Sequence, residues 1–123
     1  MIFQLSPADF AAWRDQVSTA DSAGPALLPV VLDVREPWEV QAASVKENGF
    51  TLVHIPMREI PGRLAQLQSI HDAGRPIACL CHHGMRSLQV AQYLAQGGFT
   101  RVVNLQGGIN AWSQQADPSV PRY

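Results

Sequence analysis

Residues 76–87 read PIACLCHHGMRS, a short apolar run that passes through a polar loop into the start of a helix. The apolar residues 76–80 suit a strand buried on both faces of a sheet. The segment 87–96 has the composition of a helix, and Gly97 and Gly98 behind it are typical helix stops. A buried strand followed by a loop and a helix is the building unit of a parallel α/β sheet.

The rest of the chain repeats this alternation. Ser6 is expected to cap a first helix, and Pro7 fits its first position. Because strands and helices alternate, we expect an α/β domain whose sheet is mainly parallel, with about four or five strands and helices on both faces. The other predicted strands are 30–34, 51–55 and 101–105, and the other predicted helices are 37–43, 59–73 and 109–112. The Ser-, Ala-, Gly- and Pro-rich residues 18–29 predict a surface loop.

Length and composition favour one globular domain over residues 1–123. Hydrophobic residues make up 46% and charged residues 15%, which argues against disorder. The net charge of -1 offers no field for a nucleic-acid backbone, so no nucleic-acid partner is expected. The first residues do not resemble a signal peptide, and no apolar run approaches the ~20 residues of a membrane span. We therefore expect a cytoplasmic protein with reduced thiols and no membrane partner.

The loop between strand and helix collects the groups for thiol chemistry. Cys81 begins it, and the unpaired amides and dipole of the following helix would stabilise a thiolate there. Gly84 permits the dihedrals of a tight cradle, and Arg86 adds a fixed positive charge with a planar fork for an oxyanion. These residue types predict a thiol nucleophile that faces an anionic substrate.

The neighbouring residues have more ordinary interpretations. Cys79 lies inside the apolar run and is expected to be a core residue, with a sulfur-relay role as the alternative. His82 and His83 are expected to line the mouth of the site, because ligands of a tetrahedral metal site are usually more widely spaced. No metal and no organic cofactor are expected. Trp38 and Trp112 are expected to serve packing.

Three segments together resemble the rhodanese sulfurtransferases. Cys-x-x-Gly-x-Arg-Ser at 81–87 is similar to their active-site loop, 32–39 to their upstream DVRE…E motif, and 98–112 to their closing segment. The resemblance covers about residues 28–113, in order. The Gly-His-Ile that often follows the acidic helix in this family is missing, and residues 44–50 stand in its place. A rearranged loop, with altered access to the site, is expected there.

The resemblance implies a rhodanese-like fold and a reaction in two halves. Cys81 takes the outer sulfur of thiosulfate or a related small anionic donor and becomes a persulfide. An acceptor, which can be cyanide, a thiol or a sulfur-carrier protein, then removes that sulfur. Arg86 would act on the donor with Cys81, whereas Asp33 and Arg35 would support the loops. The substrate-binding residues implied are His82, His83, Gly84, Met85 and Ser87.

Two other functional classes stay open. A non-catalytic, regulatory rhodanese-like module is the first, although the cysteine that such modules usually lack is present. The second is a cysteine phosphatase or arsenate reductase of the same fold. Those relatives resemble a Cys-x5-Arg loop, and the loop from Cys81 to Arg86 is one residue shorter.

Overall fold

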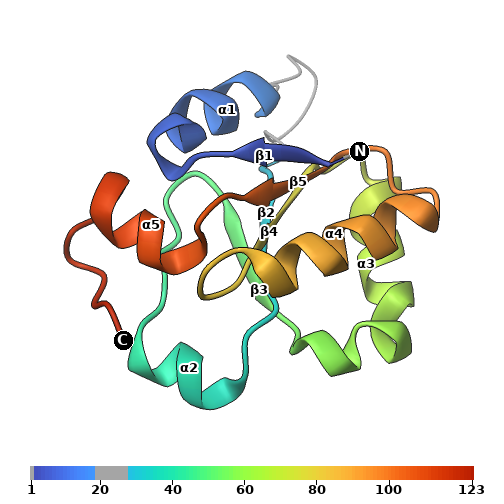
Figure 1. The fold of residues 1–123 in the computed structure, drawn as a ribbon. Coiled ribbons are helices and arrows are strands. Elements are labelled where there is room, and N and C mark those ends of the chain that lie inside the picture. Colours follow the sequence, from blue (N-terminus) through green and yellow to red (C-terminus); the bar gives the residue numbers. More distant parts are fainter. Residues whose placement is uncertain (1, 19–27) are drawn as a thin grey trace.

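One sheet of five parallel strands forms the centre of the molecule (Figure 1). The computed structural model describes residues 2–18 and 28–123. The strand order is β1-β5-β4-β2-β3, so the strands predicted at 30–34 and 76–80 lie in the middle. The strands are β1 (Phe3–Leu5), β2 (Val30–Asp33), β3 (Thr51–His54), β4 (Ile77–Leu80) and β5 (Val102–Leu105). The expected fold class is thereby confirmed.

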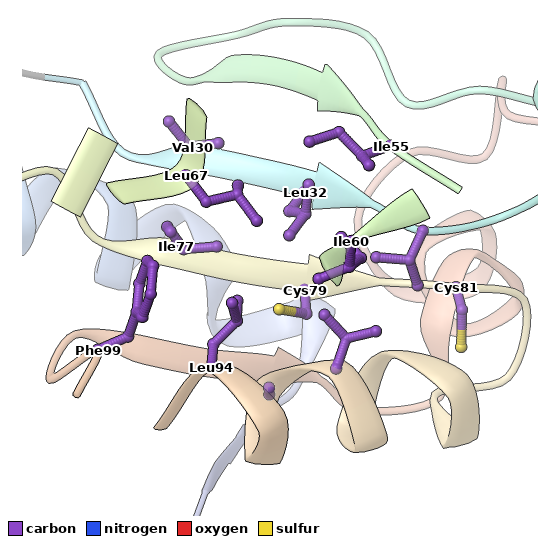
Figure 2. Close-up of a cluster of buried hydrophobic side chains, with 13 residues drawn as sticks. Val30, Leu32, Ile55, Ile60, Leu67, Ile77, Cys79, Cys81, Leu94 and Phe99 are labelled. Atoms are coloured by element: carbon purple, nitrogen blue, oxygen red, sulfur yellow. The ribbon is translucent and has the colours of Figure 1, made fainter. Parts of the chain in front are cut away.

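Helices cover both faces of this sheet. Alternate side chains of β2 and β4, such as Leu32 and Cys79, pack against α3 (Leu64–Asp72) and α4 (Met85–Gln96), as Figure 2 shows. The opposite set, with Val31 and Leu80, packs against α1 (Phe10–Val17) and α5 (Gly108–Gln115). Both faces of the two central strands are fully buried, which is why their sequences read as continuous apolar runs.

The strand β1 was not predicted from the sequence. It pairs in parallel with β5 at the edge of the sheet, where Phe3 lies opposite Val103. Phe3 and Gln4 are exposed and only Leu5 is buried, so the segment shows neither an apolar run nor a regular alternation. Its place in the sheet depends on pairing with a strand about a hundred residues later in the chain.

Several helix boundaries differ from the expectation. The helix predicted at 59–73 begins only at Leu64, after two 3₁₀ turns at Met57–Glu59 and Pro61–Arg63, because Pro61 and Gly62 disfavour a regular α-helix. The first helix also opens with a 3₁₀ turn, Pro7–Asp9, and the Ser6 hydroxyl donates to the Asp9 side chain and accepts no hydrogen bond from a helix amide. Of the predicted loop 18–29, residues 19–27 lie outside the described part.

The carboxyl ends of the central strands meet at one edge of the sheet, as they do in other parallel α/β folds. The loop from β4 to α4 lies at this edge, beside the start of α5 and the short helix α2 (Pro37–Ala42) (Figure 1). A capping box fixes the start of α2, because the Glu36 amide donates to the Glu39 carboxylate over 3.1 Å. The polar loops that the sequence singled out are therefore neighbours in space.

Candidate active site

Cys81 is the first residue after β4, and its thiol is free and almost fully buried. The Gly84 amide donates to the Cys81 Sγ over 3.0 Å, and the Ser87 Oγ lies 3.3 Å from the same sulfur. Gly84 has a φ of 100°, which a residue with a side chain rarely adopts, and this conformation turns its amide toward the sulfur. The loop therefore curls around Cys81 as the sequence predicts.

The start of α4 adds unused hydrogen-bond donors to this loop. Its first backbone bond to the loop runs from the Leu88 amide to the Gly84 carbonyl. Within the described residues, the amides of Met85, Arg86 and Ser87 have no protein acceptor. Unpaired amides at the N-terminus of a helix favour negative charge, so the loop can stabilise an anion at or near the Cys81 sulfur.

Asn104 in β5 ties the loop to the sheet. The Ser87 hydroxyl donates to Asn104 Oδ1 over 2.6 Å, while Asn104 Nδ2 donates to the Gly84 carbonyl over 3.1 Å and to Gln4 Oε1 over 2.8 Å. Both amide ends of Asn104 are thus fixed, and they orient the Ser87 hydroxyl beside Cys81. Sequence reasoning did not single out Asn104; a polar residue inside a predicted buried strand was the available signal.

The start of α5 supports the loop from the other side. The Ile109 amide donates to the Cys81 carbonyl over 2.8 Å, and the Asn110 amide donates to the His82 carbonyl over 3.1 Å. This approach needs a glycine at position 108, because a Cβ built there would lie 2.4 Å from both carbonyl oxygens. The Gly-Gly pair at 107–108 therefore serves the site and is more than a turn.

Arg86 makes a two-pronged ion pair with Glu39 of α2. Its Nη1 and Nη2 lie 2.7 and 2.9 Å from the two carboxylate oxygens, and the Tyr123 hydroxyl donates to Glu39 over 2.7 Å. The Arg86 hydrogen bonds lower the pKa of Glu39 to about 2, against the opposite effect of burial, and the Tyr123 hydroxyl lowers it further. The same Glu39 hydrogen bond raises the pKa of Arg86. The guanidinium expected to hold a substrate anion thus already has a carboxylate partner.

Asp33 and Arg35 form a fully buried ion pair at the end of β2. Arg35 Nη2 lies 2.7 Å from Asp33 Oδ2, and the guanidinium also donates to the carbonyls of Glu39 and Ala43 and to the Tyr123 hydroxyl. Hydrogen bonds and the charge of Asp33 raise the pKa of Arg35, although burial alone would lower it. These contacts join β2 to both ends of α2, and the loop-supporting role of the pair stays a prediction.

Arg35→Met is expected to destabilise the fold by about 3–5 kcal/mol, because it leaves the Asp33 carboxylate buried without a partner. The matched control is Arg58→Met, since Arg58 pairs with Glu36 on the surface and such pairs contribute about 0–1 kcal/mol. Urea unfolding followed by circular dichroism measures both. Equal, small losses for the two variants would contradict the supporting role of Arg35.

Aromatic rings stack along one side of the loop. The His82 ring lies between those of His83 and Tyr123, with centroids 3.9 and 4.0 Å away. Burial and the nearby His83 lower the pKa of His82, which favours its neutral form. Packing, the role predicted for both tryptophans, is confirmed for Trp112 in the core. Trp38 is 64% exposed, and the packing contact it makes is an edge-on one with the Tyr123 ring, with centroids 6.1 Å apart. Met85 is 71% exposed. Tyr123 carries no motif, and the sequence did not indicate its place here.

The second cysteine lies apart from these groups. Cys79 is fully buried among core side chains between the sheet and α4, whereas Cys81 lies beyond the end of the strand (Figure 2). Burial raises the pKa of the Cys79 thiol, and the nearby Cys81 adds to this effect. These surroundings favour a core residue over a sulfur relay.

Two features are absent from residues 2–18 and 28–123. Within those ranges, no group of three or more His, Cys, Asp or Glu side chains is arranged to hold a metal ion. Likewise, none of the helices described there is long and apolar enough to cross a membrane.

Comparison with known proteins identifies the family. The model of the rhodanese-like domain matches residues 11–115 of the chain. This chain belongs to the rhodanese-like family. The fold agrees, since the crystal structure of a rhodanese-related protein from Thermoplasma volcanium superposes with a TM-score of 0.71 at 26% identity, over 98% of this chain and 99% of that one.

Relatives of this rhodanese-like chain include proteins named sulfurtransferases. One from Allochromatium vinosum is 33% identical over 74% of this chain and 78% of its own length. The putative sulfurtransferase YtwF of Bacillus subtilis is 35% identical over 72% and 77%. A rhodanese-like/PpiC domain-containing protein of Arabidopsis thaliana is 39% identical over 76% of this chain, which matches only 30% of that longer protein. Transferase-type activity is thus supported by the family.

Proposed function

We propose that this protein transfers a sulfane sulfur from thiosulfate or a related donor to a thiophilic acceptor through a persulfide on Cys81. The observation that carries the proposal is the surroundings of the Cys81 sulfur. The Gly84 amide donates to the sulfur of a single thiol, the Ser87 Oγ lies 3.3 Å from that sulfur, and among the described residues the amides at the start of α4 have no protein acceptor. A thiolate and a persulfide anion both need such donors.

In the first half-reaction, the Cys81 thiolate attacks the outer sulfur of the donor. The new bond joins the two sulfurs, and the donor remainder, which is sulfite from thiosulfate, leaves with the electron pair of the broken S–S bond. In the second half, the acceptor attacks the outer sulfur of the persulfide and the Cys81 thiolate is released. Splitting the transfer in this way replaces one difficult step by two easier ones.

The other predicted residues take roles around this step. Gly84, Met85 and Ser87 contribute amides or a hydroxyl to the cradle, and His82 and His83 line its mouth. Arg86 would act on the donor from the start of α4, with its guanidinium paired to Glu39, and Asp33 with Arg35 would support the loop. The free thiol that this task uses is consistent with the cytoplasmic location expected from the sequence, because the cytosol keeps thiols reduced.

Intact-mass spectrometry tests the proposal. After brief incubation with thiosulfate, we expect the protein to gain one sulfur atom, about 32 Da, and to lose it again when cyanide is added. Fragmentation of the peptide that holds both cysteines should place the added sulfur on Cys81 and leave Cys79 unmodified. A fully reduced protein that gains no sulfur from thiosulfate or from an organic thiosulfonate would contradict the proposed function.

A further inference from the structure

The Glu39 carboxylate is saturated with hydrogen bonds. Its Oε1 accepts from Arg86 Nη1 at 2.7 Å and from the Glu36 amide at 3.1 Å. Its Oε2 accepts from Arg86 Nη2 at 2.9 Å and from the Tyr123 hydroxyl at 2.7 Å. The Glu39 side chain is only 5% exposed, so Arg86 cannot leave it without stranding a buried charge. Arg86 is therefore held in place and is not free to swing fully onto a donor.

Three arginines near the site face a carboxylate in this way. Arg86 pairs with Glu39, Arg35 with Asp33 inside the protein, and Arg58 with Glu36 at the surface over 3.4 Å. Thiosulfate carries two negative charges, and these carboxylates cancel the positive field that would attract it. The amides at the start of α4 remain, and they suit one negative charge close to the sulfur.

A partly apolar groove opens beside Arg86. Its volume is about 400 Å³, and its lining consists of Val34, Glu36, Met57, Arg58, Pro61 and Arg86. Val34, Met57 and Pro61 give it an apolar wall, and the charges of Glu36 and Arg58 oppose each other across 3.4 Å, so they add no net charge that would attract a dianion. The exposed side chain of Met85 precedes Arg86 at the start of α4. Arg86 is the residue that this groove shares with the loop around Cys81, and the volume of the groove is sufficient for a small organic group.

Resting on the proposed function, we propose that Glu39 is a specificity-determining residue. By holding and neutralising Arg86, it favours sulfur donors that carry one negative charge and an organic group over the thiosulfate dianion. An organic thiosulfonate, R–SO₂–S⁻, has this chemistry. The Cys81 thiolate forms a bond to its outer sulfur, the S–S bond breaks, and the sulfinate R–SO₂⁻ leaves with the electron pair. The persulfide that results is the same as with thiosulfate, and the organic group R occupies the groove beside Arg86.

The test compares two donors that differ only in one substituent. Benzenethiosulfonate replaces one charged oxygen of thiosulfate by a phenyl ring, and cyanide converts the sulfur from either donor to thiocyanate. Glu39→Gln keeps the size of the side chain and one acceptor oxygen but removes the charge, and its amide nitrogen cannot accept the hydrogen bonds made to the other carboxylate oxygen. We expect this variant to raise kcat/KM for thiosulfate about tenfold relative to benzenethiosulfonate, because the charge of Arg86 is no longer cancelled. The two donors differ in intrinsic reactivity, but this difference is the same for the variant and the wild type. It therefore cancels when the ratio of the two kcat/KM values is compared between the two proteins.

Glu59→Gln is the matched control. It removes the same charge from an exposed residue whose partner is Arg63, so the donor ratio should stay within about twofold of the wild-type value. Damage to the fold by Glu39→Gln would lower kcat/KM for both donors and leave their ratio unchanged. A ratio that is unchanged while kcat/KM for benzenethiosulfonate stays near the wild-type value, or a ratio that shifts against thiosulfate, overturns the inference, while persulfide formation on Cys81 in the same samples keeps the proposed function intact. Absence of persulfide with both donors contradicts the proposed function itself.

A measurement on the wild-type protein keeps the inference testable if Glu39→Gln does not fold. If the site presented a free cation, raising NaCl from about 20 mM to about 200 mM would lower kcat/KM for thiosulfate several-fold by screening. With Arg86 neutralised by Glu39, we expect no such fall. A several-fold fall for thiosulfate that exceeds the fall for benzenethiosulfonate would contradict the assignment to Glu39.

Discussion

Cys81→Ser is expected to lower sulfur-transfer turnover by about a thousandfold or more, to the level of the uncatalysed reaction. A serine hydroxyl is far less readily ionised than a thiol at neutral pH, and it cannot form the S–S bond on which the proposed cycle depends. The substitution is nearly isosteric, and the Gly84 amide can donate to an oxygen as it does to the sulfur. The fold should therefore persist while the chemistry is lost. Thiocyanate production from thiosulfate and cyanide measures the effect.

Cys79→Ala is the control for this experiment. Cys79 lies two residues earlier in the chain and is fully buried in the core, so its loss should lower stability and leave turnover within about threefold of wild type. If Cys79→Ala folds and yet loses as much turnover as Cys81→Ser, the two sulfurs act together and the core interpretation of Cys79 is wrong. Turnover retained by a folded Cys81→Ser would refute the nucleophile assignment.

The fold could be predicted where burial leaves a local pattern. The central strands β2 and β4 are buried on both faces, and the helix α4 between the Cys81 loop and Gly97 has clear boundaries. Strand β1 lacked such a pattern, because only one of its three residues is buried. The helix α3 was predicted to begin at residue 59 but begins at Leu64. The helical spacing of its apolar residues is opposed there by Pro61 and Gly62, which disfavour a regular α-helix.

The candidate site, like the fold, could be predicted only in part from the sequence. The residues of the loop itself were predicted, because Cys81, Gly84, Arg86 and Ser87 are close in sequence and lie between a strand and a helix. The groups that hold them come from distant segments, and neither the motif that ends at Glu39 nor the sequence around Tyr123 indicates which residues they contact. Glu39 lies 47 residues before its partner Arg86, and Tyr123 lies 84 residues after Glu39. The expectation that Arg86 would be open to an anion rested on its residue type, and only the three-dimensional structure places a buried carboxylate against it.

Gly108→Ala is expected to cause the second large effect, a loss of turnover of about a hundredfold with a lower free energy of unfolding. A Cβ at position 108 would lie 2.4 Å from the carbonyl oxygens of Cys81 and His82, and neither backbone group can move without shifting the loop. The amides of Ile109 and Asn110 would lose those carbonyls as partners, and the Cys81 sulfur would move away from the Gly84 amide. Displacements of about 1 Å are enough to cost a reaction this much.

Gly74→Ala separates this steric effect from backbone strain. Gly74 also has a positive φ, of 79°, but nothing lies within 4 Å of a Cβ built there. Both variants therefore share the cost of a left-handed conformation, about 1–2 kcal/mol, while only Gly108→Ala pushes against the loop. Urea unfolding gives the stability of each variant, and thiocyanate production gives its turnover. Because α5 contacts the loop through backbone groups alone at this point, equal turnover in the two folded variants would show that its close approach does not position Cys81.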